Sequence, residues 1–529
     1  MFFSLAVVAL AGFNRPLRQP VLTSTSTTRA EQQLDILIVH GKLVDGSGKK
    51  PRTSDVGIRG DRIVFVGDAR KAHIEAARMI DATGLIIAPG FIDPHTHTLN
   101  DLSDSNRKSN EAYLTQGVTT VVTGNDGGSV LNIAETLRKW DEQGIGTNAI
   151  LLAGFGTIRS RVLGPTDAQP TGPQLEGMKA LVARAMDEGA FGLSTGLYYA
   201  PQSYSKTEEV IALAKVAAAK GGIYDTHMRS ESAGLLEAIA ETIRIGREAK
   251  IPVHISHIKA LGPEVWHRSD KAIKLIKQAR AEGIEASACQ YPYTASGTSL
   301  QASLVPRWAE VGGRRELLKR IDDPDIRPRL IKEMEENLKG RGGADSLLIA
   351  DSPNREFVGQ RLNVIAQQMN KTPVEAALEL IKVGSSGVIS FNMNEKDVRL
   401  FMKAKFVTTC SDGSTGHPRK YGTFPRKLRE YVYNQKVISL RFAVRNSSAL
   451  TAEIFRIPER GLIREGYLAD VIVFDEKTVS DQATYEQPEL LSVGMKYVIV
   501  NGKVAVENDK FTGVLAGRAL RKQVQSRER

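Results

Sequence analysis

The first chemistry-bearing feature of the sequence is a His-x-His tripeptide that ends an apolar run. The segment Phe91-Ile-Asp-Pro leads directly into His95-Thr-His97. Because side chains alternate along a strand, both imidazoles point to the same face. Neutral imidazoles bind divalent metals well, so this pair forms half of a metal site. A lone His-x-His is structural about as often as it is functional, so other positions must decide.

Two more histidines and one aspartate stand at the ends of further apolar runs. Ile223 to His227 and Val253 to His257 each end in an imidazole, and Phe406 to Cys410 runs on into Asp412. In a barrel of parallel strands, residues at the carboxyl ends of the strands meet at one rim. A carboxylate at that rim can both touch a metal and move a proton. Together these residues predict a metal-dependent active site.

Four other histidines receive no site role. His254 precedes His257 by three residues, an odd offset, so its side chain points the other way and we interpret it as structural. His40, His73 and His267 do not end a strand-like run.

Strand-like apolar runs alternate with helical patterns through the middle of the chain, which predicts a parallel α/β unit. The runs cover residues 119–122, 149–153, 192–194, 251–256, 284–290 and 406–410. Because the candidate residues follow such runs directly, a (β/α)8 TIM-like barrel is preferred over an open doubly wound sheet. No dinucleotide-binding Gly-x-Gly-x-x-Gly and no Walker motif occurs in the required context. A charged, helical stretch at about 296–373 predicts an insertion near the barrel mouth.

Both ends of the chain are rich in short strand patterns. The stretch around Gly60-Asp61 and the one around Asn501-Gly502 each have a turn between two apolar runs. We therefore predict a small β-sandwich domain built from both terminal regions. The expected division is 1–30 for a signal peptide and linker, 31–88 and 461–522 for the two parts of the β-domain, 89–460 for the barrel with its insertion, and 523–529 for a tail.

Composition narrows the possible functions only modestly. The 529 residues carry a formal charge of +11, but no long basic block occurs, so we expect a basic surface and no nucleic-acid partner. Cys289 and Cys410 are the only cysteines, which excludes a disulfide framework. With 41% hydrophobic and 25% charged residues, the chain is not largely disordered.

The N-terminal segment predicts export. Met1 to Phe13 is nearly all apolar and is followed by a Ser/Thr-rich stretch from Leu22 to Thr28, as in a secretory signal, which implies a periplasmic or extracellular location. No Lys or Arg precedes the apolar run, so a short buried helix or a frayed terminus of a cytoplasmic protein stays open as the alternative. The run is too short to span a bilayer, and no other segment predicts a membrane span.

Longer segments add specificity to the single residues. They are Gly192-Leu-Ser-Thr-Gly-Leu-Tyr-Tyr-Ala-Pro201, Thr226-His-Met-Arg-Ser-Glu231, Ser256-His-Ile-Lys259, Gln290-Tyr-Pro-Tyr-Thr294 and His417-Pro-Arg-Lys-Tyr-Gly-Thr-Phe-Pro-Arg426. From about Leu34 to about Arg521 the chain resembles the metal-dependent amidohydrolase superfamily, and within it the N-acyl-D-amino-acid deacylases, or D-aminoacylases. The resemblance implies a tightly held Zn²⁺ with room for a second, weaker divalent ion. It also implies that Asp412 is the general acid/base. The metal ligands that it implies are His95, His97, His227 and His257.

The sequence departs from the family at one metal position. The family usually has a cysteine within Gly-Asn-Cys-Gly, and this chain has Gly124-Asn-Asp126-Gly127. Aspartate is a hard ligand and thiolate a soft one, so metal preference and affinity are expected to change. A carboxylate can bridge two divalent ions, which makes Asp126 a candidate ligand. The alternative is that Asp126 only stabilises an Asx turn.

By resemblance, substrate recognition falls to Arg419, with Lys259 and Tyr291 nearby. A planar guanidinium suits bidentate capture of a free α-carboxylate, although a surface ion pair is the alternative for Arg419. The implied activity is hydrolysis of N-acyl-D-amino acids, which are small-molecule substrates, to a carboxylate and a free D-amino acid. Hydrolysis of cyclic amides or dipeptides and a non-catalytic metal-containing binding protein stay open as alternatives, as does the oligomeric state.

Overall fold

The computed structural model describes Met1 and residues 33–522. The expected signal peptide and linker, apart from Met1, and the expected tail at 523–529 lie outside the described residues.

The centre of the molecule is built from parallel strands whose spatial order follows their order in the chain. One sheet has the order β10-β9-β8, and a second has the order β11-β12-β13-β14-β15-β19. The strands are β8 (Phe91–Asp93), β9 (Val118–Thr123), β10 (Asn148–Leu151), β11 (Ala153–Gly154), β12 (Gly192–Gly196), β13 (Ile223–His227), β14 (Val253–Ile255), β15 (Ala286–Gln290) and β19 (Val407–Thr409). Only Leu152 separates β10 from β11, and a parallel bridge joins Thr96 to Gly413, just beyond β8 and β19. These strands confirm the apolar runs predicted from the sequence.

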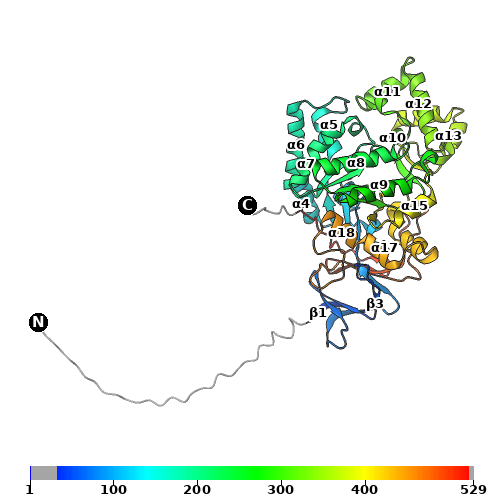
Figure 1. The fold of residues 1–529 in the computed structure, drawn as a ribbon. Coiled ribbons are helices and arrows are strands. Elements are labelled where there is room, and N and C mark those ends of the chain that lie inside the picture. Colours follow the sequence, from blue (N-terminus) through cyan, green and yellow to red (C-terminus); the bar gives the residue numbers. More distant parts are fainter. Residues whose placement is uncertain (2–32, 523–529) are drawn as a thin grey trace, which may run out of the picture.

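Helices lie between these strands in the chain, or follow the last of them, and confirm the predicted α/β class (Figure 1). They include α4 (Ile133–Gln143), α6 (Gly172–Asp187), α7 (Thr207–Ala219), α8 (Leu235–Ala249), α9 (Ser269–Ala281), α15 (Glu395–Met402), α17 (Leu440–Ser447) and α18 (Ala449–Phe455). In α8, for example, Leu235, Ala238, Ile239, Thr242 and Ile243 are buried, a spacing that places one helical face against the sheet. Because every strand runs in the same direction, all their carboxyl ends lie at one edge.

Strands from both ends of the chain pair with each other. A seven-stranded sheet has the order β23-β22-β21-β20-β7-β2-β3, and a four-stranded sheet has the order β5-β4-β1-β6. Their bounds are β1 (Leu34–Val39), β2 (Lys42–Leu43), β3 (Arg52–Thr53), β4 (Asp55–Arg59), β5 (Arg62–Gly67), β6 (Ala76–Asp81), β7 (Ile86–Pro89), β20 (Val471–Phe474), β21 (Met495–Val500), β22 (Lys503–Glu507) and β23 (Lys510–Phe511). The antiparallel pair of β7 with β20 joins the two ends, and apolar side chains of both sheets share one core.

Residues 296–390, which lie between β15 and β19 in the chain, form a separate layer at the end of the molecule opposite β1 and β3 (Figure 1). It contains an antiparallel sheet of order β16-β18-β17, surrounded by helices. The elements are β16 (Ser296–Ser299), α10 (Leu300–Leu304), α11 (Arg314–Asp322), α12 (Arg327–Gly340), β17 (Leu347–Asp351), α13 (Leu362–Gln368), α14 (Pro373–Val383) and β18 (Gly387–Ser390). Their apolar side chains form a core of their own.

The inserted layer extends beyond the end at about residue 373 expected from the sequence. Pro373 is the first residue of α14, where a proline is favourable, and Thr372 and Glu375 form a capping box that starts this helix. The chain then continues into β18, which pairs with both β16 and β17. The insertion therefore runs to Ser390.

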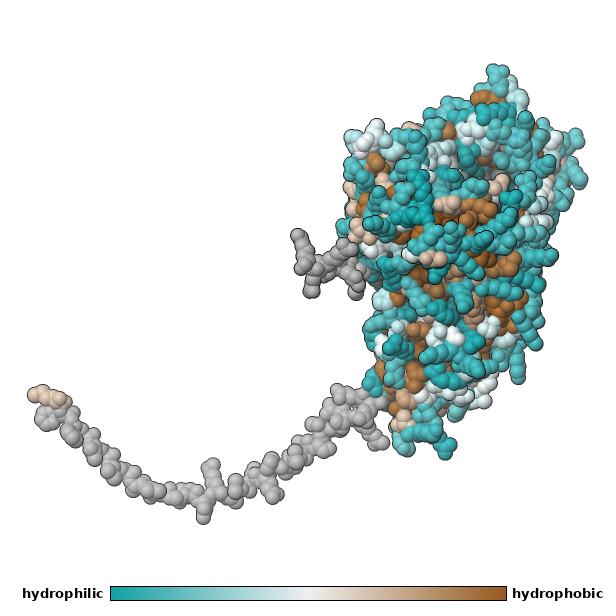
Figure 2. Space-filling model, in the orientation of Figure 1, coloured by the Kyte–Doolittle hydropathy of each residue, from teal (hydrophilic) through white to brown (hydrophobic). Residues whose placement is uncertain are grey.

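Most of the face shown in Figure 2 is hydrophilic, with apolar side chains gathered in patches over the middle of the molecule. Among the described residues, no helix combines the length and the apolar character needed to cross a bilayer.

Candidate metal centre and substrate pocket

The strands bring all the predicted metal-site residues together at one edge. His95 and His97 follow β8, His227 is the last residue of β13, and His257 lies just beyond β14. Asp126 lies at their centre: its Oδ1 atom is 3.4 Å from His95 Nε2, 3.9 Å from His227 Nδ1 and 3.7 Å from His257 Nε2. Its Oδ2 atom is 3.7 Å from His97 Nε2.

Asp412 completes the cluster from the end of β19. Its Oδ1 atom is 3.1 Å from His97 Nε2 and 3.7 Å from His95 Nε2. Ligand atoms that share a tetrahedral zinc at about 2 Å lie roughly 3.3 Å apart. The separations in this cluster are therefore close to those of a metal site.

Unpartnered polar atoms in the cluster provide an independent test of the fit to a metal. Both ring nitrogens of His95, Nδ1 of His227 and Oδ1 of Asp126 are buried and have no hydrogen-bond partner. Buried polar atoms in folded proteins nearly always have a partner, because desolvation without one is costly. A divalent cation among these nitrogen and carboxylate donors would satisfy them, so the residues present fit a metal.

The backbone at the site is held in conformations that are unfavourable for ordinary residues. The φ angle is 56° at Asp126, 33° at His257 and 48° at Asp412. Such left-handed residues cost about 1–3 kcal/mol each and persist only where the surroundings hold them, as at functional sites. At Asp126 the holding contact comes from Gln202, whose Nε2 donates to the Asp126 carbonyl at 2.8 Å and whose Oε1 accepts from Gly196 N at 2.7 Å.

The charges of the cluster favour a cation in its centre. Burial alone raises the pKa of Asp412, but the Arg419 guanidinium and the nearby imidazoles hold it well below its usual range. Burial has the same effect at Asp126, and His95 and His257 more than offset it, so the pKa of this carboxyl is also low. Two ionised carboxylates are thus enclosed by imidazoles, an arrangement that attracts a divalent ion.

Glu231 belongs to the site, and the sequence analysis assigned it no role. Its Oε1 accepts a hydrogen bond from Lys259 Nζ at 2.6 Å and lies 2.9 Å from His257 Nδ1, and its Oε2 lies 3.8 Å from His227 Nε2. The available signal was its place four residues after His227 in one of the family segments. A carboxylate on the second nitrogen of a ligand imidazole orients the ring and fixes its tautomer.

Replacing Glu231 with glutamine is expected to weaken metal binding about 10- to 100-fold, the usual effect of losing such an outer partner. Competition with a chelator, followed by metal analysis, measures this change. Glu264→Gln is the matched control, because Glu264 lines the same pocket but is exposed. Equal metal affinity of the Glu231→Gln variant and the wild type would contradict the assigned role.

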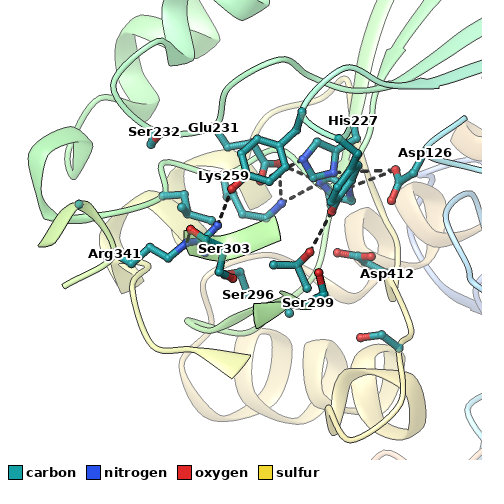
Figure 3. A pocket seen from close by; sticks show the side chains of 18 of the residues that line it. Asp126, His227, Glu231, Ser232, Lys259, Ser296, Ser299, Ser303, Arg341 and Asp412 are labelled. Atoms are coloured by element: carbon teal, nitrogen blue, oxygen red, sulfur yellow. Dashed lines mark hydrogen bonds and ion pairs between the residues drawn. The ribbon is translucent and has the colours of Figure 1, made fainter. Parts of the chain in front are cut away.

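The cluster opens into a cavity of about 600 Å³ (Figure 3). Lys259, Tyr291 and Arg419, the predicted substrate residues, all line it and are buried. Arg419 is not a surface residue: its Nη1 lies 2.8 Å from Asp412 Oδ2, and its guanidinium lies 4.6 Å from the centre of the Tyr291 ring. The Tyr291 hydroxyl donates to Met393 Sδ at 3.7 Å.

Two histidines outside the metal cluster have separate surroundings. The Nδ1 atom of His254 lies 2.9 Å from Ser287 Oγ, and its ring packs edge-on against Phe455. His254 therefore faces away from the cluster, as expected. Its Nε2 atom has no hydrogen-bond partner. His417, which the sequence analysis did not assign, accepts from Arg419 N at 3.1 Å and so positions Arg419. His40, His73 and His267 are exposed.

Comparison with known proteins places this site in a family. Residues 78–506 match the model of the amidohydrolase family. The chain belongs to the amidohydrolase family. Over 516 residues this amidohydrolase is 35% identical to the D-aminoacylase of Alcaligenes xylosoxydans xylosoxydans, with 92% of this chain and 98% of that protein covered.

Two solved structures share the fold of this amidohydrolase closely. A D-aminoacylase described as having a binuclear metal centre superimposes with a TM-score of 0.81 at 33% identity, covering 92% of this chain and all, 100%, of that chain. The N-acyl-D-glutamate deacylase of Bordetella bronchiseptica, solved with zinc and a phosphonate that mimics the tetrahedral intermediate, gives a TM-score of 0.80 at 30% identity, covering 93% and 100%.

Proposed function

We propose that this amidohydrolase cleaves the amide bond of N-acyl-D-amino acids and releases a carboxylate and a free D-amino acid. The observation that carries the proposal is the cluster of four imidazoles and two carboxylates at one end of the pocket, in which buried nitrogen and oxygen atoms have no hydrogen-bond partner. The deacylase relatives support the choice of substrate.

The chain offers a ligand set for zinc without any sulfur. We assign His95, His97, Asp126, His227 and His257 as the residues that would hold one tightly bound Zn²⁺ and a second, weaker divalent ion, with Asp126 as the candidate ligand shared by both. The central position of Asp126 Oδ1 among three imidazoles supports this assignment. Bound zinc supplies an acidified water and polarises the acyl carbonyl.

Asp412 is the proposed general acid/base. The low pKa of its carboxyl keeps it ionised, so it can accept a proton from the attacking water. Its Oδ2 is held by Arg419 and its Oδ1 lies beside His97, which fixes the carboxylate in one orientation. The protonated carboxyl of Asp412 then gives this proton to the leaving amine. One residue therefore serves both proton transfers.

Arg419, Lys259 and Tyr291 are proposed to hold the free α-carboxylate of the substrate. The support is that all three line the pocket and are buried, and that both cations lie over the Tyr291 ring. With the carboxylate at Arg419 and the acyl group at the metal centre, the position of the amino acid side chain distinguishes the D from the L configuration.

Replacing Arg419 with lysine is expected to lower kcat/KM about tenfold or more for substrates with a free α-carboxylate, because an ammonium cannot reproduce the paired donors. An α-amide analogue should lose much less. Steady-state kinetics with both compounds tests this. If both lose equally, Arg419 acts on Asp412 and not on the substrate.

Three further proposals concern architecture and location. The two parallel sheets are parts of one (β/α)8 barrel, which the bridge between Thr96 and Gly413 supports. The two terminal sheets form a small β-sandwich domain, which their shared core supports. The apolar run from Met1 to Phe13 directs export to the periplasm or the exterior, and fractionation of cells that express the full chain tests this proposal.

Hydrolysis by the zinc-loaded enzyme, measured as acetate release from N-acetyl amino acids and as ring opening of cyclic amides, tests the proposed function directly. N-acetyl-D-amino acids should be hydrolysed, and their L forms and cyclic amides should be hydrolysed far more slowly. Preferential cleavage of cyclic amides would favour the alternative amidohydrolase reaction. Failure to cleave any amide would favour a binding protein.

A further inference from the structure

The inserted layer contributes an arginine to the pocket that no other charged group neutralises. Arg341 follows the last residue of α12 and is only 7% exposed. In Figure 3 it lies with Ser303 on the side of the pocket opposite Asp126 and Asp412. It is therefore placed to contact the part of a substrate that is farthest from the metal centre.

All the hydrogen bonds of Arg341 go to neutral acceptors. Its Nε donates to the Ser303 carbonyl at 2.9 Å, Nη1 to Ser390 Oγ at 3.3 Å, and Nη2 to Tyr198 Oη at 2.8 Å. A guanidinium has five N–H groups, so two of them have no protein acceptor in this set. Both belong to the terminal nitrogens that a carboxylate would engage as a pair.

The other buried arginines in the described part of the chain have a carboxylate partner. Arg159 pairs with Glu209, Arg419 with Asp412, and Arg460 with Asp470. Glu264 and Glu336 line the same pocket as Arg341, but both are exposed and neither forms an ion pair with it. A buried charge without a counter-ion is unfavourable, and an anionic ligand would remove that penalty.

The surroundings of Arg341 suit a polar anion. Ser296, Thr298, Ser299 and Ser303 line the cavity with hydroxyl groups. Two guanidinium groups meet at Tyr198, because Arg341 Nη2 donates to its hydroxyl at 2.8 Å and the Arg307 guanidinium lies 4.5 Å from the centre of its ring, so this wall carries positive charge. An apolar side chain placed here would leave the two remaining guanidinium N–H groups and the unpartnered Ser303 hydroxyl without hydrogen-bond partners.

We propose that Arg341 binds a side-chain carboxylate, so that the preferred substrates are the N-acyl derivatives of acidic D-amino acids. The inference rests on the proposed deacylase function and assigns its side-chain preference. Family membership alone does not decide this point, because the relatives include both a D-aminoacylase and a deacylase for N-acyl-D-glutamate. The substrate then spans the pocket with two carboxylates, one at Arg419 and one at Arg341.

The test compares kcat/KM of the zinc-loaded enzyme for N-acetyl-D-glutamate and N-acetyl-D-aspartate with that for N-acetyl-D-glutamine and N-acetyl-D-leucine. Glutamine has nearly the shape of glutamate and lacks only the charge. The better acidic substrate should exceed both neutral ones by about 100-fold or more, as expected for a site whose buried donors require an acceptor. Arg341→Met should abolish most of this preference, and Arg341→Lys should retain part of it.

Arg307→Met is the matched control. The Arg307 guanidinium lies 4.5 Å from the centre of the Tyr198 ring and does not line the pocket, so its loss removes a nearby positive charge but should leave the preference unchanged. Thermal unfolding of each variant confirms that it is folded. If the wild type prefers N-acetyl-D-leucine, or if Arg341→Met leaves the ratio unchanged, the inference is wrong and the deacylase function stands. If none of the four compounds is cleaved, the deacylase function itself fails.

Discussion

Asp412→Asn is expected to remove nearly all turnover while the metal content changes little. The amide has the shape of the carboxylate but cannot accept a proton from water at the same position. Loss of a general acid/base costs on the order of 10²- to 10⁴-fold, and more where one group serves both proton transfers. The measurements are kcat and the metal-to-protein ratio after dialysis. Activity within about threefold of the wild type would exclude this role for Asp412.

Asp481→Asn is a suitable control for the Asp412 variant. Like Asp412, Asp481 pairs with an arginine, in this case Arg426 at 3.1 Å. Arg426 does not line the pocket, and Asp481 does not contact the imidazole cluster. Its replacement therefore removes a carboxylate from an arginine without touching the proposed proton path. We expect this variant to keep kcat within a few fold of the wild type, even if its stability falls by about 1 kcal/mol.

Replacing Asp126 with alanine is expected to lower both metal content and activity, whereas Asp126→Cys should restore tight zinc binding and some turnover. The reason is that Asp126 Oδ1 lies between three imidazoles and has no hydrogen-bond partner in the protein. A site with oxygen in place of sulfur should also accept harder ions such as Mn²⁺ more readily. Metal analysis after dialysis, with both ions supplied, tests each expectation.

Asp126→Asn separates ligation from the conformation of the turn. Alanine is strained at the φ of 56° found at Asp126, whereas asparagine tolerates this region nearly as well as aspartate. The asparagine variant should therefore fold normally and yet bind metal more weakly, because it lacks the negative charge. Full zinc occupancy in both the alanine and the asparagine variants would show that Asp126 is only a turn residue.

The sequence predicts the metal centre well because its signals are local. His95 and His97 are recognised by alternation along one strand, and His227 by its place at the end of an apolar run. The core strands are equally clear, because buried parallel strands are nearly continuous apolar runs. The structure then shows what local patterns cannot give, namely that these strand ends meet around Asp126.

Residues whose role depends on distant contacts were not found from the sequence. Arg341 bonds to Tyr198, 143 positions earlier, and to Ser390, 49 positions later, so no spacing rule connects them. The end of the insertion, expected at about residue 373, is wrong for a related reason: the charged, helical pattern of the sequence stops there, and only the pairing of β18 with β16 and β17 shows that the layer continues. The role of Glu231 depends on its contact with the imidazole of His257, which lies just beyond the next strand.

The separate core of the inserted layer has a consequence for how this enzyme can change over evolutionary time. The metal ligands lie on the central strands, whereas Arg341, Ser296 and Ser303 lie on a segment that packs around its own apolar side chains. Selection for a new substrate can therefore act on the inserted segment without disturbing the strands that hold the metal. Grafting residues 296–390 from a relative is accordingly a direct way to exchange substrate preference while the catalytic machinery is inherited intact.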